Sequence, residues 1–127
     1  MTHPHKARSG LQRILHATGY SIAGLAAAWR HESAFRQECV LAVVMLPAAW
    51  WVGRNWIEAA LLAGSVMGVL IVELLNSAIE SVVDRVSSDL HPLSKRAKDI
   101  GSAAVMLSLV TCAALWCAAL WQRWMLA

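Results

Sequence analysis

Long apolar stretches dominate the chain and predict membrane-spanning helices. The clearest is 100–121, where 22 consecutive residues carry no charge, enough to cross a hydrocarbon core of about 30 Å. Residues 39–53 are also uncharged, but as a helix they would span only about 22 Å. Extension back to about residue 33 adds an arginine and a glutamate, whose long side chains can reach the headgroups near a span end. We therefore predict a first span over about 33–52 and a third over 100–121.

The apolar stretch between these two carries a polar stripe. Residues 59–72 are uncharged, and Glu73 interrupts a run that otherwise continues to Ile79. With Glu73 accommodated, a second span over about 57–80 is long enough to cross. An ionisable group at that depth costs on the order of 3 kcal/mol or more, so function is the first hypothesis and a polar seam between helices the alternative. On a helical wheel the stripe covers about 80° and consists of Glu73, Asn76, Glu80 and Asp84.

Residues about 9–30 show the spacing of an amphipathic helix. Apolar side chains recur every three or four residues, with Arg13, His16 and Arg30 off that row. The pattern predicts a helix lying on the membrane surface, interrupted at 19–21, where glycine, tyrosine and serine follow one another. The apolar row comprises Leu11, Ile14, Leu15, Ile22, Leu25 and Trp29.

The composition agrees with a small membrane protein. Of 127 residues, 58% are hydrophobic and 15% charged, and the mean hydropathy is +0.52. A soluble domain of this size could not bury so much apolar surface. We therefore expect an all-α membrane protein in which 1–127 form a single domain, without a nucleic-acid partner. The basic N-terminus lacks the apolar core of a secretory signal peptide, and Cys39, Cys112 and Cys117 are expected to be free thiols.

Basic residues and tryptophans predict the orientation of the spans. Nine Lys and Arg residues lie before or at the start of the first span or between the second and third, against Arg54 and Arg123 on the other side. Because excess positive charge marks the cytoplasmic side, the N-terminus and the 84–99 loop are predicted to be cytoplasmic. Six tryptophans are expected at the outer interface, where amphipathic rings favour the headgroup level: Trp50, Trp51, Trp56, Trp116, Trp121 and Trp124.

Polar groups from all three spans are predicted to meet at the cytoplasmic interface. Carboxylates beside basic side chains suggest a divalent cation with phosphate, since Mg²⁺ usually combines one or two carboxylates with substrate phosphate oxygens. Glu73 could then serve as the base for a lipid hydroxyl in phosphoryl transfer. An ion pair between Glu32 and Arg36 is the structural alternative for that end of the first span. The groups expected to join Glu73 there are Glu32, Arg36, Glu38, Lys98, Asp99 and Ser102.

Five stretches of the chain form a specific set of motifs. They are GYS (19–21), AAW (27–29), ESAFRQE (32–38), ELLNSAIESVVDRV (73–86) and HPLSKRAKDIGSAAV (91–105). Together they closely resemble the small prokaryotic diacylglycerol kinases, a family that includes the undecaprenol kinases of Gram-positive bacteria. The resemblance implies a homotrimer in the bacterial inner membrane, with three transmembrane helices and an N-terminal amphipathic surface helix per subunit. It also implies transfer of the γ-phosphate of ATP, with Mg²⁺, to a lipid hydroxyl in cytoplasmic active sites shared between subunits.

The resemblance further implies roles for residues at matching positions. The family's general base matches Glu73, and Asn76 matches a functional position beside the base. Its metal ligands match Glu32 and Glu80, which also contact the nucleotide. Its other nucleotide contacts match Tyr20, Asp89, Leu90, His91, Lys98 and Asp99. Its lipid contacts, besides the base, match Arg13, Ala17, Thr18, Gly19, Tyr20, Ser21, Ile22, Ala34, Phe35, Arg36, Gln37, Glu38 and Ser102.

The sequence leaves the lipid acceptor open between two branches of that family. Leu90 stands where members carry an aromatic residue, and Pro92 matches the undecaprenol-kinase branch, whereas 1–30 and 76–86 are closer to the diacylglycerol branch. We expect phosphorylation of diacylglycerol to phosphatidic acid, with undecaprenol as the alternative acceptor. A small proton-coupled transporter that uses Glu73 as its proton carrier is a more distant alternative. A membrane scaffold without chemistry would leave the other acidic residues unexplained.

Overall fold

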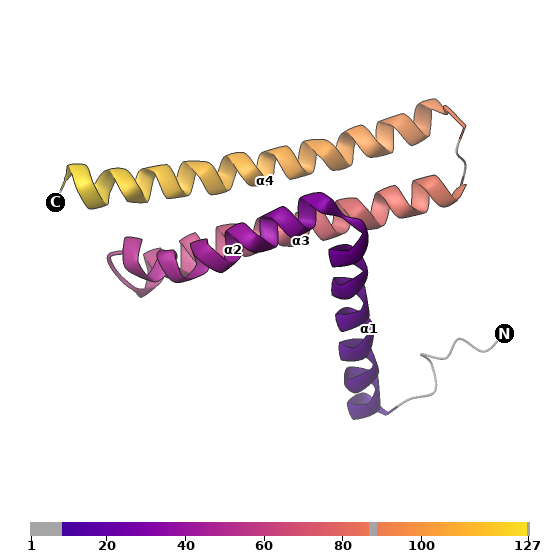
Figure 1. Ribbon diagram of the computed structural model, residues 1–127, viewed down its shortest axis with the longest axis horizontal. Coiled ribbons are helices and arrows are strands. Elements are labelled where there is room, and N and C mark those ends of the chain that lie inside the picture. Colours follow the sequence, from indigo (N-terminus) through magenta and orange to yellow (C-terminus); the bar gives the residue numbers. More distant parts are fainter. Residues whose placement is uncertain (1–8, 87–88, 127) are drawn as a thin grey trace.

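The described part of the chain, residues 9–86 and 89–126 of the computed structural model, is helical and contains no strand. Its helices are α1 (Gly10–His31), α2 (Ser33–Val52), α3 (Trp56–Val86) and α4 (Pro92–Met125) (Figure 1). The last three are each long and apolar enough to cross a membrane. The predicted all-α fold, with an amphipathic helix followed by three candidate spans, is therefore confirmed.

Two of the helices are longer than the apolar runs from which they were predicted. α3 has 31 residues and α4 has 34, so at 1.5 Å per residue both exceed a hydrocarbon core of about 30 Å. α3 stays helical past Glu73 because neither glycine nor proline occurs in the rest of it. α4 begins early because Pro92 fits the first helical turn and the His91 Nδ1 atom accepts a hydrogen bond of 3.0 Å from Leu93 N.

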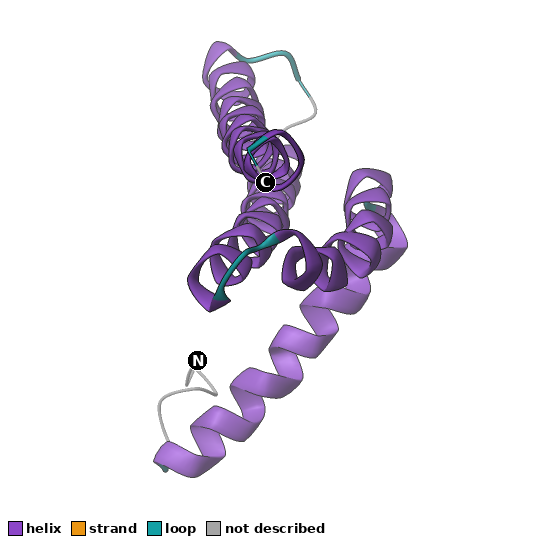
Figure 2. Cartoon of the chain, turned by 90° about the vertical axis from the view of Figure 1, so that its left-hand side faces the viewer, coloured by secondary structure: helices purple, strands orange, loops and turns teal. Residues whose placement is uncertain are grey.

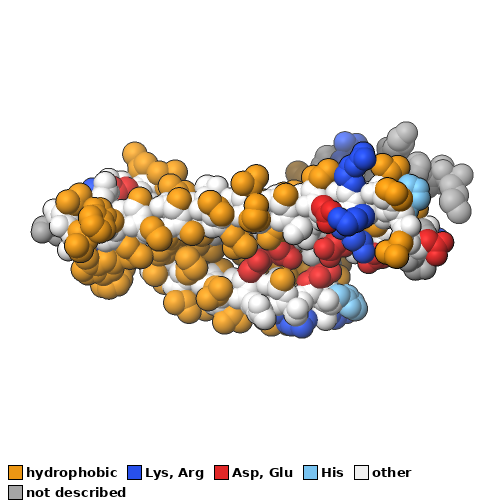
Figure 3. Space-filling view, turned by 90° about the horizontal axis from the view of Figure 1, so that it is seen from above, with side chains coloured by type: hydrophobic (Ala, Val, Ile, Leu, Met, Phe, Trp, Pro, Cys, Tyr) orange, Lys and Arg blue, Asp and Glu red, His pale blue; other side chains and the backbone are white. Residues whose placement is uncertain are grey.

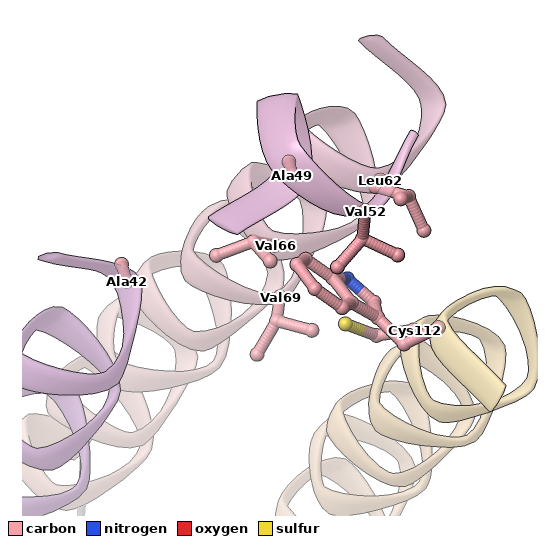
Figure 4. Packing of buried hydrophobic residues seen from close by; sticks show 8 residues of the cluster. Ala42, Ala49, Val52, Leu62, Val66, Val69 and Cys112 are labelled. Carbon is pink, nitrogen blue, oxygen red and sulfur yellow. The ribbon is translucent and has the colours of Figure 1, made fainter. Parts of the chain in front are cut away.

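The three long helices form a bundle with α3 in its middle. α3 packs along both α2 and α4, whereas α2 and α4 hardly touch each other. Small side chains on α2 permit the close approach, since Ala42 and Ala49 are buried against α3 (Figure 4). Trp116 was expected at the headgroups but is buried in this core, where α4 turns its indole toward α2 and α3. The core consists of Ala42, Ala49, Val52, Leu62, Val66, Val69, Cys112 and Trp116.

The first helix leaves the bundle sideways and is continuous (Figure 1). The interruption predicted at 19–21 does not occur. The hydroxyls of Thr18 and Ser21 donate hydrogen bonds of 2.9 Å to the carbonyls of Ile14 and Ala17, one turn earlier. These polar side chains therefore bond inside the helix instead of supporting a turn. The apolar row of α1 is exposed along its length, as a helix lying on a membrane surface requires.

One end of the bundle, formed by residues 53–55 and the last turn of α4, is called here the tryptophan end (Figure 2). The ring centroids of Trp50 and Trp56 lie 4.7 Å apart, and those of Trp51 and Trp124 lie 5.5 Å apart. Aromatic rings therefore gather at this end as predicted. A Cβ on Gly53 would lie 2.6 Å from the backbone nitrogen of Ala59, so the tight turn between α2 and α3 has no room for a side chain.

The opposite end, where α1 joins α2 and where α3 leads into α4, is called here the carboxylate end. Acidic and basic side chains gather over this end in the space-filling view, whereas apolar side chains predominate over the rest of the face shown (Figure 3). Glu32 is the one residue between α1 and α2, with an extended backbone at φ −117° and ψ 104°. The chain therefore changes direction at a carboxylate.

Candidate active site

The first part of the polar stripe of α3, Glu73 and Asn76, lies on the face that α3 turns inward, whereas Asp84 at its end is exposed. Glu73 is 6% exposed and Asn76 is 9% exposed, and Ser77 beside them is also buried. The Nδ2 atom of Asn76 donates to Glu80 Oε1 at 3.3 Å, so the amide orients the carboxylate one turn further along. The sequence predicted a single face for these residues, and the structure places them on one.

Two carboxylates from the start of the bundle approach this face. Glu32, at the junction of α1 and α2, lies within electrostatic range of Glu73, as does Glu80. Glu38, on the second turn of α2, also interacts electrostatically with Glu73. The four side chains are called here the carboxylate cluster. Two helices, α2 and α3, and the α1–α2 junction thus bring like charges near one another, although neighbouring carboxylates repel one another.

No basic side chain forms an ion pair with the carboxylate cluster in the described part of the chain, although Lys98 lies within electrostatic range of Glu80. None of the ion pairs there involves Glu32, Glu38, Glu73 or Glu80. The Glu38 Oε2 atom is buried and has no hydrogen-bond partner among the described residues. A cluster of oxygens with uncompensated charge is suited to binding a hard cation, because such ions prefer oxygen ligands.

The basic residue nearest in sequence, Arg36, is directed elsewhere. Its Nη1 atom donates to the carbonyl of Trp29 at 2.7 Å and to that of Arg30 at 3.2 Å. These carbonyls belong to the last turn of α1, where the helix dipole favours positive charge. The ion pair between Glu32 and Arg36, considered as a structural alternative, is therefore absent, and Arg36 instead fixes the α1–α2 junction.

A cleft of about 600 Å³ separates α1 from α3 and is called here the α1–α3 cleft. Glu32 and Ser21 line it from α1 and its end, and Ser77 and Ser81 line it from α3. Apart from His31, the rest of its wall is apolar or small. The lining residues are Ser21, Gly24, Leu25, Ala27, Ala28, His31, Glu32, Leu74, Ser77, Ala78 and Ser81.

A second cleft, of about 240 Å³, lies between the end of α3 and the start of α4 and is called here the α3–α4 cleft. The Nζ atom of Lys98 lies 2.7 Å from Asp84 Oδ1 and is also within electrostatic range of Glu80. Lys95 pairs with Asp99 at 2.6 Å. The five residues predicted for nucleotide binding here, Asp89, Leu90, His91, Lys98 and Asp99, all line this cleft.

The predicted lipid contacts are more scattered. Ser21 lines the α1–α3 cleft, whereas Arg13, Ala17, Thr18, Gly19, Tyr20 and Ile22 are exposed on α1 and outside that lining. Ala34 and Gln37 are exposed on the first turns of α2, and Ser102 is exposed on α4. Phe35 is buried at the α1–α2 junction. A single chain therefore brings together the predicted base and metal positions but not the full set of predicted lipid contacts.

Four residues of the site were not predicted to act in it. Ser77 and Ser81 line the α1–α3 cleft, and Asp84 holds Lys98. Gly101 lies against Asn76. Asp84 was already part of the polar stripe predicted from the sequence. Its pairing with Lys98 follows once α4 runs antiparallel to α3. The sequence carries no signal for the contact of Gly101, because it depends on how α3 and α4 cross.

The two positions predicted to bind metal, Glu32 and Glu80, suit only a cation that takes the rest of its coordination from a ligand and water. Among the described residues, no group of three or more His, Cys, Asp or Glu side chains is arranged to hold a metal ion. Glu32 and Glu80 both lie within electrostatic range of Glu73. Mg²⁺ commonly uses one or two protein carboxylates and completes its shell with phosphate oxygens and water.

Comparison with known proteins identifies similar chains over almost the whole length. The model of the family described as prokaryotic diacylglycerol kinase matches residues 19–120. A protein named diacylglycerol kinase from Pseudomonas aeruginosa is 53% identical over 113 residues, covering 89% of this chain and 92% of the relative. One of that name from Escherichia coli (strain K12) is 50% identical over 115 residues, covering 91% and 94%. Another from Haemophilus influenzae is 44% identical over 108 residues, covering 85% and 92%.

Proposed function

Because this chain belongs to the prokaryotic diacylglycerol kinase family, we propose that it transfers the γ-phosphoryl group of ATP to diacylglycerol. The products are phosphatidic acid and ADP. The observation that carries this proposal within the molecule is the carboxylate cluster around Glu73, beside one cleft open to the end of the bundle and another between α1 and α3. Neither the transporter nor the scaffold is supported by the family match.

Glu73 is the proposed general base. Its carboxylate accepts the proton of the lipid hydroxyl while that oxygen attacks the γ-phosphorus, and the bond from phosphorus to the β–γ bridging oxygen breaks. The bridging oxygen leaves with ADP. Phosphoryl transfer depends mainly on positioning and on stabilisation of charge, with one group to take the proton. Asn76, one turn from Glu73, orients Glu80 through its 3.3 Å hydrogen bond.

The α3–α4 cleft is the proposed nucleotide site. Lys98 brings a positive charge next to Glu80 and Asp84, where it can contact phosphate oxygens. Glu32 and Glu80 are the proposed ligands of Mg²⁺, which when bound would neutralise negative charge between the carboxylates and the nucleotide phosphates. The cluster's unpaired carboxylates support this assignment.

The α1–α3 cleft is the proposed place for the lipid headgroup. Its polar groups, Ser21, Glu32 and Ser77, lie among apolar side chains such as Leu25 and Leu74. That mixture suits an amphipathic alcohol, whose hydroxyl must reach a carboxylate while its glycerol and ester portions stay near the acyl chains. The remaining predicted lipid contacts on α1, α2 and α4 would complete the site from a neighbouring subunit.

We further propose a homotrimer in the bacterial inner membrane, with the N-terminus and the carboxylate end in the cytoplasm. The excess of Lys and Arg at that end supports the orientation. The scattered lipid contacts support active sites shared between subunits. Mixing inactive Glu73→Gln chains with chains inactivated at the scattered lipid contacts, by Arg13→Ala combined with Gln37→Ala, tests the sharing, because mixed trimers should regain activity in part. Two inactive variants that never complement each other would indicate complete sites within single chains.

The experiment that tests the function is a kinase assay of the purified protein in mixed micelles. Labelled ATP and Mg²⁺ are supplied with diacylglycerol, with undecaprenol, or without lipid. We expect label in phosphatidic acid and little in the other two samples. Preferential labelling of undecaprenol would reassign the acceptor, and no labelled lipid in either sample would overturn the proposal.

A further inference from the structure

Gly101 occupies a place on α4 where a side chain would collide with the site. A Cβ on Gly101 would overlap Asn76 Oδ1 and lie 3.3 Å from Asn76 Cγ. A Cβ on Gly64 or Gly68, the other glycines within the long helices, would meet no atom within 4 Å. Gly101 is itself buried. The absence of a side chain at position 101 therefore leaves room for one specific residue of α3, Asn76.

Asn76 spans the gap between Gly101 and Glu80. Its Oδ1 atom is buried and has no hydrogen-bond partner among the described residues, and it faces the Cα of Gly101. Its Nδ2 atom donates to Glu80 Oε1 at 3.3 Å. A carboxylate can only accept hydrogen bonds, so the amide nitrogen must face Glu80 and the oxygen must face α4. Contacts of Cα–H with oxygen are common where two helices pack closely.

We propose that Gly101 is a positioning residue for Glu80, acting through Asn76. Because Gly101 lacks a side chain, the Asn76 amide lies between α3 and α4 with its nitrogen on the Glu80 carboxylate. The direction of that carboxylate is thus set from the opposite helix. The kinetic consequence rests on the proposed function, in which Glu80 is a ligand of the metal that accompanies ATP.

A single methyl group tests the arrangement. In Gly101→Ala, either Asn76 moves away from Glu80 or α3 and α4 separate. Loss of a group that orients a metal ligand typically lowers metal affinity by about 10- to 100-fold. We therefore expect the Mg²⁺ concentration for half-maximal activity to rise by about tenfold or more. The KM for the lipid should stay near that of the parent protein.

The first measurement needs neither activity nor ligand. Thermal unfolding midpoints are compared in detergent for the parent, Gly101→Ala, Asn76→Ala and the double variant, with Gly64→Ala as matched control. Glycine to alanine in a helix normally stabilises, so the control should keep or raise the midpoint. Gly101→Ala should lower the midpoint by about 5 °C or more, and in the Asn76→Ala background the same change should cost nothing. Equal losses in both backgrounds, or no loss in the parent, would overturn the proposed contact.

The second measurement separates positioning from general packing. Purified, folded Gly101→Ala is assayed for its dependence on Mg²⁺, on ATP and on lipid. A raised Mg²⁺ requirement with an unchanged lipid KM supports positioning of Glu80. A thermal loss with unchanged Mg²⁺ dependence overturns it and leaves only a packing role. If the parent protein phosphorylates no lipid, the proposed function fails, and Mg²⁺-dependent binding of ATP to the two proteins decides the positioning instead. If Gly101→Ala does not fold alone, recovery of folding in the double variant supports the contact and continued misfolding overturns it.

Discussion

Lys98 on α4 and Asp84 on α3 are joined across the α3–α4 cleft, with Nζ 2.7 Å from Oδ1. Both side chains remain exposed, at 44% and 65%, so water screens the pair and it contributes little to stability. Its effect is geometric. Asp84 keeps the ammonium group of Lys98 over the cleft and near Glu80, where a nucleotide phosphate would meet it.

The Asp84→Asn variant should therefore affect nucleotide use more than folding. Without the carboxylate, Lys98 turns freely, and we expect a severalfold higher KM for ATP with a thermal midpoint close to that of the parent protein. Steady-state kinetics at saturating lipid measure the first quantity. The matched control is Glu58→Gln, which weakens the Arg54–Glu58 pair at the tryptophan end and should leave KM unchanged. An unchanged KM in Asp84→Asn would mean that Lys98 needs no partner.

Glu73→Gln tests the proposed general base. The amide has the same size and fits the buried site, but it cannot accept the proton of the lipid hydroxyl. We expect kcat to fall by about 10²- to 10⁴-fold, the usual contribution of a general base, with ATP binding largely retained. Turnover of labelled ATP and equilibrium binding of ATP are measured on the same preparation. Near-normal turnover would assign the proton to another group.

Glu80→Gln tests the proposed metal ligand. Removal of its charge should raise the Mg²⁺ concentration for half-maximal nucleotide binding by about tenfold or more. Binding is titrated with Mg²⁺ at fixed ATP, so the result does not depend on the lipid. The same titration on Glu58→Gln shows what loss of a remote carboxylate does. An affinity and metal dependence equal to those of the parent protein would count against a ligand role for Glu80.

Trp116 offers a test of the core. Its indole is buried, and its Nε1 atom has no hydrogen-bond partner among the described residues. A buried donor without a partner costs free energy, so Trp116→Phe, which removes the donor and keeps a ring, should leave the thermal midpoint unchanged or raise it. Trp116→Ala should destabilise by about 3–5 kcal/mol because it leaves a cavity. A loss in the Phe variant as large as that in the Ala variant, beyond what the smaller ring accounts for, would indicate that the indole nitrogen has a partner in the assembled protein.

The orientation is tested by thiol labelling in a variant without Cys39, Cys112 and Cys117. A cysteine at Trp56 should react with an impermeant reagent added outside the inner membrane, since the tryptophan end is proposed to face outward. One at Ser94 should react only after the membrane is permeabilised. The reverse pattern would invert the topology and place the carboxylate cluster away from cytoplasmic ATP.

Local features could be predicted from the sequence because they depend on neighbours along the chain. The apolar runs predicted three spans, and the spacing from Glu73 to Glu80 predicted one polar face. Arg36 shows the limit of such reasoning, since its position beside Glu32 suggested an ion pair. In the structure, Arg36 instead donates to carbonyls at the end of α1. The sequence could not predict this contact, because only the fold shows which carbonyls near a helix terminus lie within reach of a side chain.

Contacts that depend on how the helices cross could not be predicted from the sequence. Tryptophan is a residue type typical of membrane interfaces, yet the side chain of Trp116 on α4 faces the core of the bundle. Gly101 stands among ordinary small residues, and its contact with Asn76 follows from the packing of α3 on α4. The interruption predicted at 19–21 failed for a different reason, since Thr18 and Ser21 found partners within their own helix.

Trp29, whose carbonyl accepts a hydrogen bond from Arg36 at the α1–α2 junction, can also serve as a fluorescent probe. Trp29 is the one tryptophan of seven that lies on the surface helix, and its indole is partly exposed within a few residues of Glu32. Replacement of the other six by phenylalanine would leave a single emitter near the junction of α1 and α2. Its emission wavelength would then follow, in real time, how the surface helix responds as lipid or nucleotide arrives.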